Sequence, residues 1–181
     1  KFKERQKFLG DIQADIDLFT EILTRLEKLT LTKHDPKLEA LTTKLKEITK
    51  GKDARKMVIF TEYADTALYL EKRLAHIFKD HLVTVCGQLS AMTLNTILKN
   101  FDASYKTQEN QYQILLATDK MSEGFNLNRA GAIINYDIPW NPTRVIQRVG
   151  RINRISKKLF DELYIYNFFP TEQGASEIGR A

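Results

Sequence analysis

The sequence predicts a doubly wound α/β domain with a mainly parallel sheet, preceded by a helical extension. Apolar residues recur at helical spacing over the first fifty residues. Beyond residue 56, short runs of apolar, largely β-branched residues alternate with amphipathic stretches. These runs are apolar at successive positions, which is typical of strands that helices cover on both faces. We therefore expect a helical lead-in over residues 1–50 and an α/β domain over residues 51–181.

The helical lead-in is expected to contain two helices. Alternating steps of four and three place one apolar stripe on the first helix, formed by Ile12, Ile16, Phe19, Leu23 and Leu26. A break is predicted at His34-Asp35-Pro36, because proline disfavours helical geometry in the residue before it. The apolar side of the second helix consists of Leu38, Leu41, Leu45 and Ile48. Gly51 is expected to end this helix.

Five strands and three helices are expected in the α/β domain. The strands are predicted at residues 57–60, 83–86, 113–117, 132–136 and 163–166. The helices are predicted at residues 67–78, with Leu68, Leu70, Leu74 and Phe78 inward, at residues 94–101, and from Asn141-Pro142 onwards. Asparagine is a favoured helix cap and proline a favoured first-turn residue. Because ligands bind beyond the carboxyl ends of parallel strands, functional residues should follow the strands directly.

Composition limits the classes of function. Cys86 is the only cysteine and the three histidines are scattered, so we expect no disulfide, no metal site and a reducing, intracellular compartment. The net charge of +5 permits nucleic-acid binding, although a solvated basic face explains it equally well. No apolar run approaches the ~20 residues of a membrane helix, so no membrane partner is expected. Because the chain begins at Lys1 rather than methionine, we interpret it as a piece of a longer protein.

Three arginines fall within one short segment that is predicted to be helical. Arg148, Arg151 and Arg154 are three residues apart, which places them close to one face of a helix. The guanidinium group is permanently charged and its planar donors suit phosphate. Gly150 suggests a bend or the close approach of another backbone. A solvated arginine face explains the spacing equally well.

Polar residues follow the strand predicted at 113–117. The Thr118 hydroxyl and the backbone around Gly124 could contact a phosphate, and Asn126 could hydrogen-bond a ribose. An ordinary strand-to-helix connection is the alternative.

The segment after the strand predicted at 132–136 contains Trp140 between two prolines. A large aromatic residue in such a loop favours a contact role over a core role. Asp137 follows an apolar strand and so imitates a magnesium-binding motif, but Ile138 and Pro139 are not the neighbours that such a motif requires.

In this order and spacing, these segments resemble motifs V, Va and VI of helicase superfamily two. Residues 147–154 read Gln-x-x-Gly-Arg-x-x-Arg, residues 137–142 resemble the Swi/Snf branch, and residues 122–126 resemble the bacterial RapA-like ATPases. Residues 58–63 resemble motif IV, and residues 87–90 resemble the Gly-x-Leu-Ser turn of the family. The resemblance extends over about residues 55–168 and implies a RecA-like, three-layer α/β/α domain, the second motor lobe of such an ATPase. Ile155-Ser156-Lys157 departs from the Gly-Gln of many Swi/Snf members.

The resemblance implies roles for the residues around ATP. Arg151 and Arg154 would be arginine fingers that neutralise charge on the transferred phosphoryl group. Gln147 and Arg148 would couple that site to the partner lobe. Near the nucleotide sugar, the resemblance places Gly124, Asn126 and Glu123.

It also implies a set of residues that contact nucleic acid. Thr61, Gly87, Thr118 and Lys120 would touch the DNA backbone without reading its sequence. Trp140 would lie against the tracked strand.

The implied cofactor is ATP with Mg²⁺, held mainly by a missing N-terminal RecA-like lobe. Gly51-Lys52 is followed by Asp53, so the chain has no phosphate-binding loop and is expected neither to bind a cofactor nor to hydrolyse ATP alone. The acidic pair Asp161-Glu162 precedes its strand and is interpreted as a solvated turn. The implied partners are double-stranded DNA, the N-terminal lobe of the same parent chain, and RNA polymerase or another nucleoprotein complex. The implied location is the cytoplasm of a bacterium.

Two other classes of function remain. The chain could be a non-catalytic nucleic-acid or phosphate-binding module from a degenerate ATPase, although simple binding does not require both Arg151 and Arg154. An unrelated α/β enzyme would need a phosphate-binding loop or a catalytic triad, and the sequence contains neither.

Overall fold

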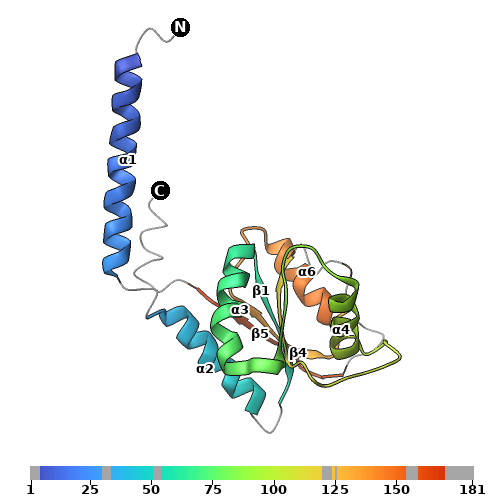
Figure 1. Cartoon of the computed structure of the whole chain (residues 1–181). Coiled ribbons are helices and arrows are strands. Elements are labelled where there is room, and N and C mark those ends of the chain that lie inside the picture. Colours follow the sequence, from blue (N-terminus) through green and yellow to red (C-terminus); the bar gives the residue numbers. More distant parts are fainter. Residues whose placement is uncertain are drawn as a thin grey trace. The chain divides into compact units, whose positions relative to one another are not determined.

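The computed structural model describes residues 5–29, 34–50, 54–119, 124, 126–153 and 159–169 (Figure 1). It divides the chain into two compact units, residues 1–40 and residues 41–181. The division falls inside the second helix, ten residues before the boundary expected from the sequence.

The first unit contains helix α1 (Arg5–Lys28) and the start of helix α2 (Pro36–Lys50). No residue of α1 is buried. Asp35 begins α2, because its carboxylate accepts a hydrogen bond from the backbone N–H of Leu38 at 3.0 Å. Among the helices in the described part of the chain, none combines the length and apolarity that crossing a membrane would need.

The second unit is built on a sheet of five parallel strands. They are β1 (Lys56–Thr61), β2 (Leu82–Val85), β3 (Ile114–Thr118), β4 (Ala130–Asn135) and β5 (Tyr164–Asn167). Their order is β2-β3-β1-β4-β5, and every neighbouring pair is parallel. The predicted parallel sheet is therefore confirmed.

In the described residues after β1, the α-helices are α3 (Ala64–Phe78), α4 (Ala91–Phe101) and α6 (Pro142–Ile152), with a short 3-10 helix η1 (Lys79–His81) after α3. Ser90 caps α4 by accepting from the N–H of Thr93 at 3.0 Å. Asn141 caps α6 by accepting from the N–H of Thr143 at 2.9 Å, and Pro142 lies in the first turn, as the sequence predicts.

The hydrophobic core lies on both faces of the sheet. Figure 1 shows α3 on one side and α4 with α6 on the other. Residues 57–61 of the central strand β1 are fully buried. The α4/α6 face is formed mainly by Val58, Phe60, Val85, Ile97, Phe101, Leu115, Ala117, Ile133 and Ile152.

One inward residue of α3 was predicted wrongly. Leu68 is 50% exposed, and Ala67 is buried in its place. Ala67 lies three residues before the buried Leu70, whereas residues two apart do not face the same side of a helix.

At the amino end of β1, Arg55 lies against β4 and the turn that leads into β5. Its guanidinium carbon is 4.8 Å from the ring centre of Phe160 and 4.3 Å from that of Tyr164. Its Nη1 donates to the backbone carbonyl of Glu162. A Cβ added at Gly131 would lie 2.7 Å from Arg55 Cδ and 3.0 Å from the Phe160 ring. We call these five residues the Arg55 cluster.

Arg129, the residue before β4, holds the polar connection between α4 and β3 through hydrogen bonds. Its Nη1 donates to the carbonyls of Lys99 at 2.8 Å and Glu109 at 2.9 Å, and its Nη2 donates to Asn110 Oδ1 at 2.5 Å. The Lys56 ammonium also donates to the carbonyl of Tyr112 at 2.8 Å. Burial, and next the charge of Arg129, lower the pKa of Lys56 to about 8.

We expect Gly131→Ala to lower the free energy of unfolding by about 1–3 kcal/mol, because the added methyl group meets Arg55 and Phe160. The matched control is Gly150→Ala on the exposed side of α6, where nothing lies within 4 Å of an added Cβ. That control should raise stability by up to about 1 kcal/mol, as alanine is the better helix former. Urea unfolding of both variants measures the difference, and equal effects would contradict the Arg55 cluster.

The lowered pKa of Lys56 predicts a pH-dependent stability. Between about pH 8 and about pH 10.5, the unfolded chain holds the proton that folded Lys56 has released, so the free energy of unfolding rises with pH over this range. Lys56→Met lacks this contribution. Urea unfolding of both chains should give a wild-type stability that increases relative to Lys56→Met across the range. A constant difference would show that Lys56 titrates normally.

Candidate functional site

Polar residues from several strands meet at the carboxyl edge of the sheet, as the sequence predicts. Arg148 of α6 joins them. Its Nε and Nη2 donate to the two carboxylate oxygens of Asp119, after β3, at 2.5 and 2.6 Å. Its Nη1 donates to Asn135 Oδ1 at the end of β4 at 2.8 Å and to the carbonyl of Asp137 at 3.0 Å. The guanidinium also lies 5.2 Å from the ring centre of Phe60. These residues form the Arg148 cluster.

The Arg148 cluster holds a buried charge. The Arg148 side chain is only 2% exposed, whereas that of Asp119 is 20% exposed. A buried guanidinium is stable only when a counter-charge and acceptors replace water, and both are present here. The two-point contact with Asp119 is specific to the planar fork of arginine. The cluster therefore fixes α6 to the ends of β3 and β4.

A further set of contacts supports the cluster. Asn135 Nδ2 donates to Asn167 Oδ1 of β5 at 2.7 Å. The hydroxyl of Thr61, at the end of β1, donates to the Asp137 carboxylate. Residues in or directly after four of the five strands thus contribute to one network. Strand β1 supplies Phe60 and Thr61.

The carboxyl end of α6 lies beside the residues that precede β4. The N–H of Leu127 donates to the carbonyl of Arg151 at 3.0 Å. Asn126 and Arg151 are half-buried, and Ile152 is buried. Gly124 is exposed and has a φ of +95°, which favours glycine. The backbone of Arg151 is therefore bonded to Leu127, the residue that follows Asn126, and the sequence predicts contacts with ATP for both Asn126 and Arg151.

Several predicted site residues have buried side chains. Thr61 is 0% and Thr118 is 6% exposed, and the contact of these two residues with a nucleic-acid backbone stays a prediction. The hydroxyl of Thr61 is turned toward Asp137. Arg148 is likewise enclosed, so any coupling to another lobe would act through the cluster rather than by direct contact. The close backbone approach expected at Gly150 is not found, since nothing in the described chain lies near its added Cβ.

Other predicted contact residues are exposed. Trp140 is 93% exposed in the loop before α6, and Gln147 is exposed on α6. Gly87 lies in an exposed turn with a φ of +76°. Beside Trp140, Arg144 donates to Glu62 at 2.9 Å, which joins the start of α6 to the end of β1.

Three predicted site residues, Lys120, Glu123 and Arg154, lie outside the described residues. The described helix α6 ends at Ile152 with Asn153 as its C-cap, and it carries Arg148 and Arg151.

Sequence reasoning missed the partners of Arg148. Asp119 directly follows β3 and Asn135 ends β4, and that position was the available signal; Asn167, which ends β5 and bonds to Asn135, carries the same signal. Asp161 and Glu162 precede β5 and are exposed, as predicted. Among the described residues, no group of three histidine, cysteine, aspartate or glutamate side chains could hold a metal ion.

A family model described as the helicase conserved C-terminal domain matches residues 36–156. An uncharacterized ATP-dependent helicase, YqhH of Bacillus subtilis, is 28% identical over 155 residues, which cover 84% of this chain and 24% of the relative. The RNA polymerase-associated protein RapA of Vibrio cholerae is 28% identical over 136 residues, 71% of this chain and 13% of the relative. The ATP-dependent RNA helicase dbp8 of Aspergillus fumigatus is 31% identical over 132 residues, 72% of this chain and 23% of the relative.

The chain spans about a quarter or less of the length of these curated relatives. Among solved structures, the C-terminal part of the Fun30 ATPase domain has a TM-score of 0.63 and 20% identity, covering 94% of this chain and 57% of that one. At this identity the likeness shows the fold, and it confirms the RecA-like architecture expected from the motifs.

We expect Arg148→Met to lower the free energy of unfolding by about 3–5 kcal/mol, because it removes the two hydrogen bonds to Asp119 and the donor to the buried Asn135 side chain. Arg144→Met is the matched control on the same helix. Its ion pair with Glu62 is 53% exposed on the arginine side, so its loss should cost less than about 1 kcal/mol. Urea unfolding separates the two. Similar small losses for both variants would mean that the Arg148 cluster does not hold the fold.

Proposed function

The chain belongs to the helicase conserved C-terminal domain family, and on that basis we propose that it is the C-terminal motor lobe of an ATP-dependent, DNA-stimulated Swi/Snf-type translocase. In this role it supplies arginine side chains to ATP that is bound with Mg²⁺ on an N-terminal lobe of the same parent protein. The observation that carries the proposal is the hydrogen bond from the Leu127 N–H to the Arg151 carbonyl, which holds the end of a helix anchored by Arg148 against the residue that follows Asn126.

The chemistry assigned to Arg151 and Arg154 is electrostatic. Charge develops on the phosphoryl oxygens during transfer, and a guanidinium held nearby stabilises that charge. Arg151 is half-buried rather than solvated, so little conformational freedom would remain to be lost at the phosphate. Asn126, Gly124 and Glu123 are assigned to the nucleotide sugar and its surroundings.

Nucleic acid is assigned to the opposite end of α6. Trp140, almost fully exposed in the loop before the helix, offers a flat aromatic surface to a strand. Gly87 and Lys120 would contact the sugar–phosphate backbone. The motif at residues 137–142 and the likeness to RapA favour duplex DNA, and a nucleoprotein complex such as RNA polymerase is a further partner. The likeness to dbp8, an RNA helicase by name, makes RNA the alternative strand.

The two ends of α6 would then be coupled by the Arg148 cluster. Asp119 follows β3 directly and contacts Arg148, while Arg151 lies three residues further along the same helix. A movement of the strand ends caused by nucleic acid would therefore move Arg151.

ATP hydrolysis by the full-length protein that contains this chain tests the proposal. We expect Arg151→Ala and Arg154→Ala each to lower DNA-stimulated kcat by about 10³–10⁵-fold, because each removes charge stabilisation from the transition state. Binding of ATP and DNA should persist. Arg73→Ala on α3 is the matched control and should leave turnover unchanged. Duplex DNA and RNA are compared as stimulators.

Unchanged turnover in both arginine variants would overturn the motor-lobe proposal. A full-length protein that binds nucleic acid but never hydrolyses ATP would favour the binding-module alternative. Stimulation by RNA alone would keep the motor lobe but reject the DNA assignment.

A further inference from the structure

The turn that leads from α6 to β5 is held by a residue from the opposite end of the domain sequence. Arg55 lies two residues before Met57, the first fully buried residue of β1, yet its guanidinium contacts the rings of Phe160 and Tyr164 and the carbonyl of Glu162. A planar cation between two aromatic rings is a geometry that arginine forms better than lysine. The absence of a side chain at Gly131 makes this approach possible.

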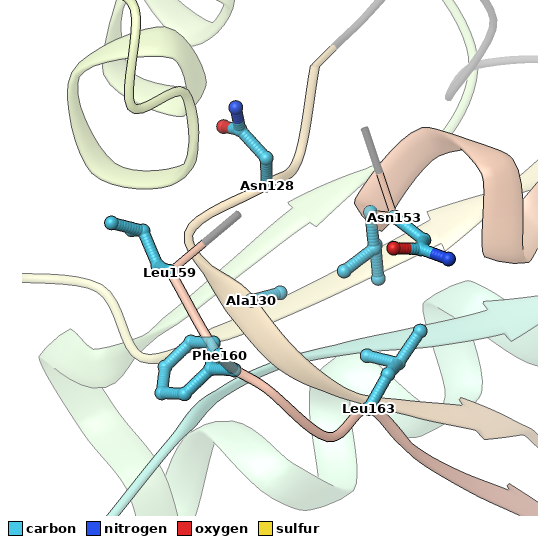
Figure 2. Close-up of a pocket in the computed structure, with 7 residues that line it drawn as sticks. Asn128, Ala130, Asn153, Leu159, Phe160 and Leu163 are labelled. Atoms are coloured by element: carbon cyan, nitrogen blue, oxygen red, sulfur yellow. The ribbon is translucent and has the colours of Figure 1, made fainter. Parts of the chain in front are cut away.

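The same turn lies against the end of α6. Figure 2 shows Leu159, Phe160 and Leu163 on one side of a small hollow, with Asn128, Ala130 and Asn153 around the rest of it; Ile152 also lines it. The hollow has a volume of about 20 Å³, enough for about one water molecule. Leu159, Phe160 and Leu163 therefore share this hollow with Ile152 and Asn153, and Leu163 packs against the core cluster to which Ile152 belongs.

The position of Arg151 depends on these neighbours. Ile152 is 5% exposed and packs in the core, and the Arg151 carbonyl accepts from Leu127. If residues 159–163 moved away, Ile152 would lose packing partners on one side and the last turn of α6 would lose its support. Asn153, whose N–H donates to the carbonyl of Val149 at 2.8 Å, would be displaced with it.

We propose that Arg55 is a positioning residue for Arg151: by holding Phe160, Glu162 and Tyr164, it keeps residues 159–163 against Ile152 and so fixes the end of α6. This inference rests on the proposed contact of Arg151 with an ATP phosphate. Arg55 acts only through the packing of the turn and touches neither ATP nor nucleic acid. Because Arg55 N–H also bonds to the Ile48 carbonyl of α2 at 3.4 Å, the residue connects the segment that enters the domain with the arginine-bearing helix.

The test in the full-length protein is Arg55→Met, which keeps the aliphatic stem but removes the guanidinium. We expect kcat for ATP hydrolysis to fall about 10–100-fold with little change in the KM for ATP, because a catalytic arginine is misplaced rather than removed. Lys44→Met is the matched control. Lys44 also places a cation over an aromatic ring of β5, 5.2 Å from the centre of Tyr166, but it lies outside the turn.

Amide hydrogen exchange in the chain itself gives a readout that is independent of ATP. In Arg55→Met, the amides of Leu127 and Asn153 should exchange faster, since their acceptors belong to the last turns of α6. The amide of Tyr136, bonded to the Phe60 carbonyl at 2.9 Å, should keep its protection. If Arg55→Met fails to fold, Arg55→Lys retains the charge without the planar fork and should show the same pattern to a smaller degree.

The outcomes separate this inference from the proposed function. If Arg151→Ala keeps full turnover, both are overturned. If Arg151→Ala abolishes turnover while Arg55→Met matches Lys44→Met in kcat, the positioning role alone is rejected, whatever the exchange data show. A loss of kcat with unchanged exchange at Leu127 and Asn153 would also reject it.

Discussion

The buried charge of Arg148 is the constraint on which the rest of this site depends. A guanidinium that is 2% exposed must keep its counter-charge and its acceptors, since water cannot replace them. Asp119, Asn135 and the Asp137 carbonyl are therefore held at fixed positions relative to α6. The helix cannot slide over the sheet without breaking several charge-assisted hydrogen bonds at once. The ends of β3 and β4 and the whole of α6 consequently behave as one body.

In the proposed motor lobe, this rigidity would give α6 a mechanical role. Its 11 residues extend over about 16 Å at ~1.5 Å per residue. Trp140 lies just before its first turn and Arg151 lies in its last, so a nucleic-acid contact and a phosphate contact would be separated by that length. Because the helix is fixed near its middle by Arg148, the two ends can be displaced only together with the sheet. Such a rigid connection would suit the proposed function, in which Arg151 contacts ATP that is bound on another lobe.

The sequence predicts the layer structure well because each element carries its own local signal. Strands that are apolar on both faces, and the Asn141-Pro142 cap, need no knowledge of distant residues. It is harder to predict which individual side chains point into the interior. Arg148 and Arg151 are three residues apart and so lie near one side of α6, but the small angle between them is enough to bury one and leave the other half-exposed.

Contacts between residues that are far apart in the chain could not be predicted from the sequence. The resemblance implies a contact of Thr61 with nucleic acid, and in the structure the Thr61 hydroxyl donates to Asp137, from a loop 76 residues later. The Arg55 cluster joins residues from three separate parts of the chain, and neither arginine nor glycine carries a local signal for it. Such pairs become visible only when the sheet order is known.

The sheet order also has a consequence for how the chain is made. The first strand of this sheet in chain order, β1, occupies its centre and pairs with β3 and β4, which begin at residues 114 and 130. Its apolar residues therefore have no native strand partner until most of the domain has left the ribosome. Non-local parallel pairing of this kind slows folding, and an unpaired apolar strand is prone to aggregate in the meantime. The strand order thus predicts that β1 pairs late, after β3 and β4 have been synthesised.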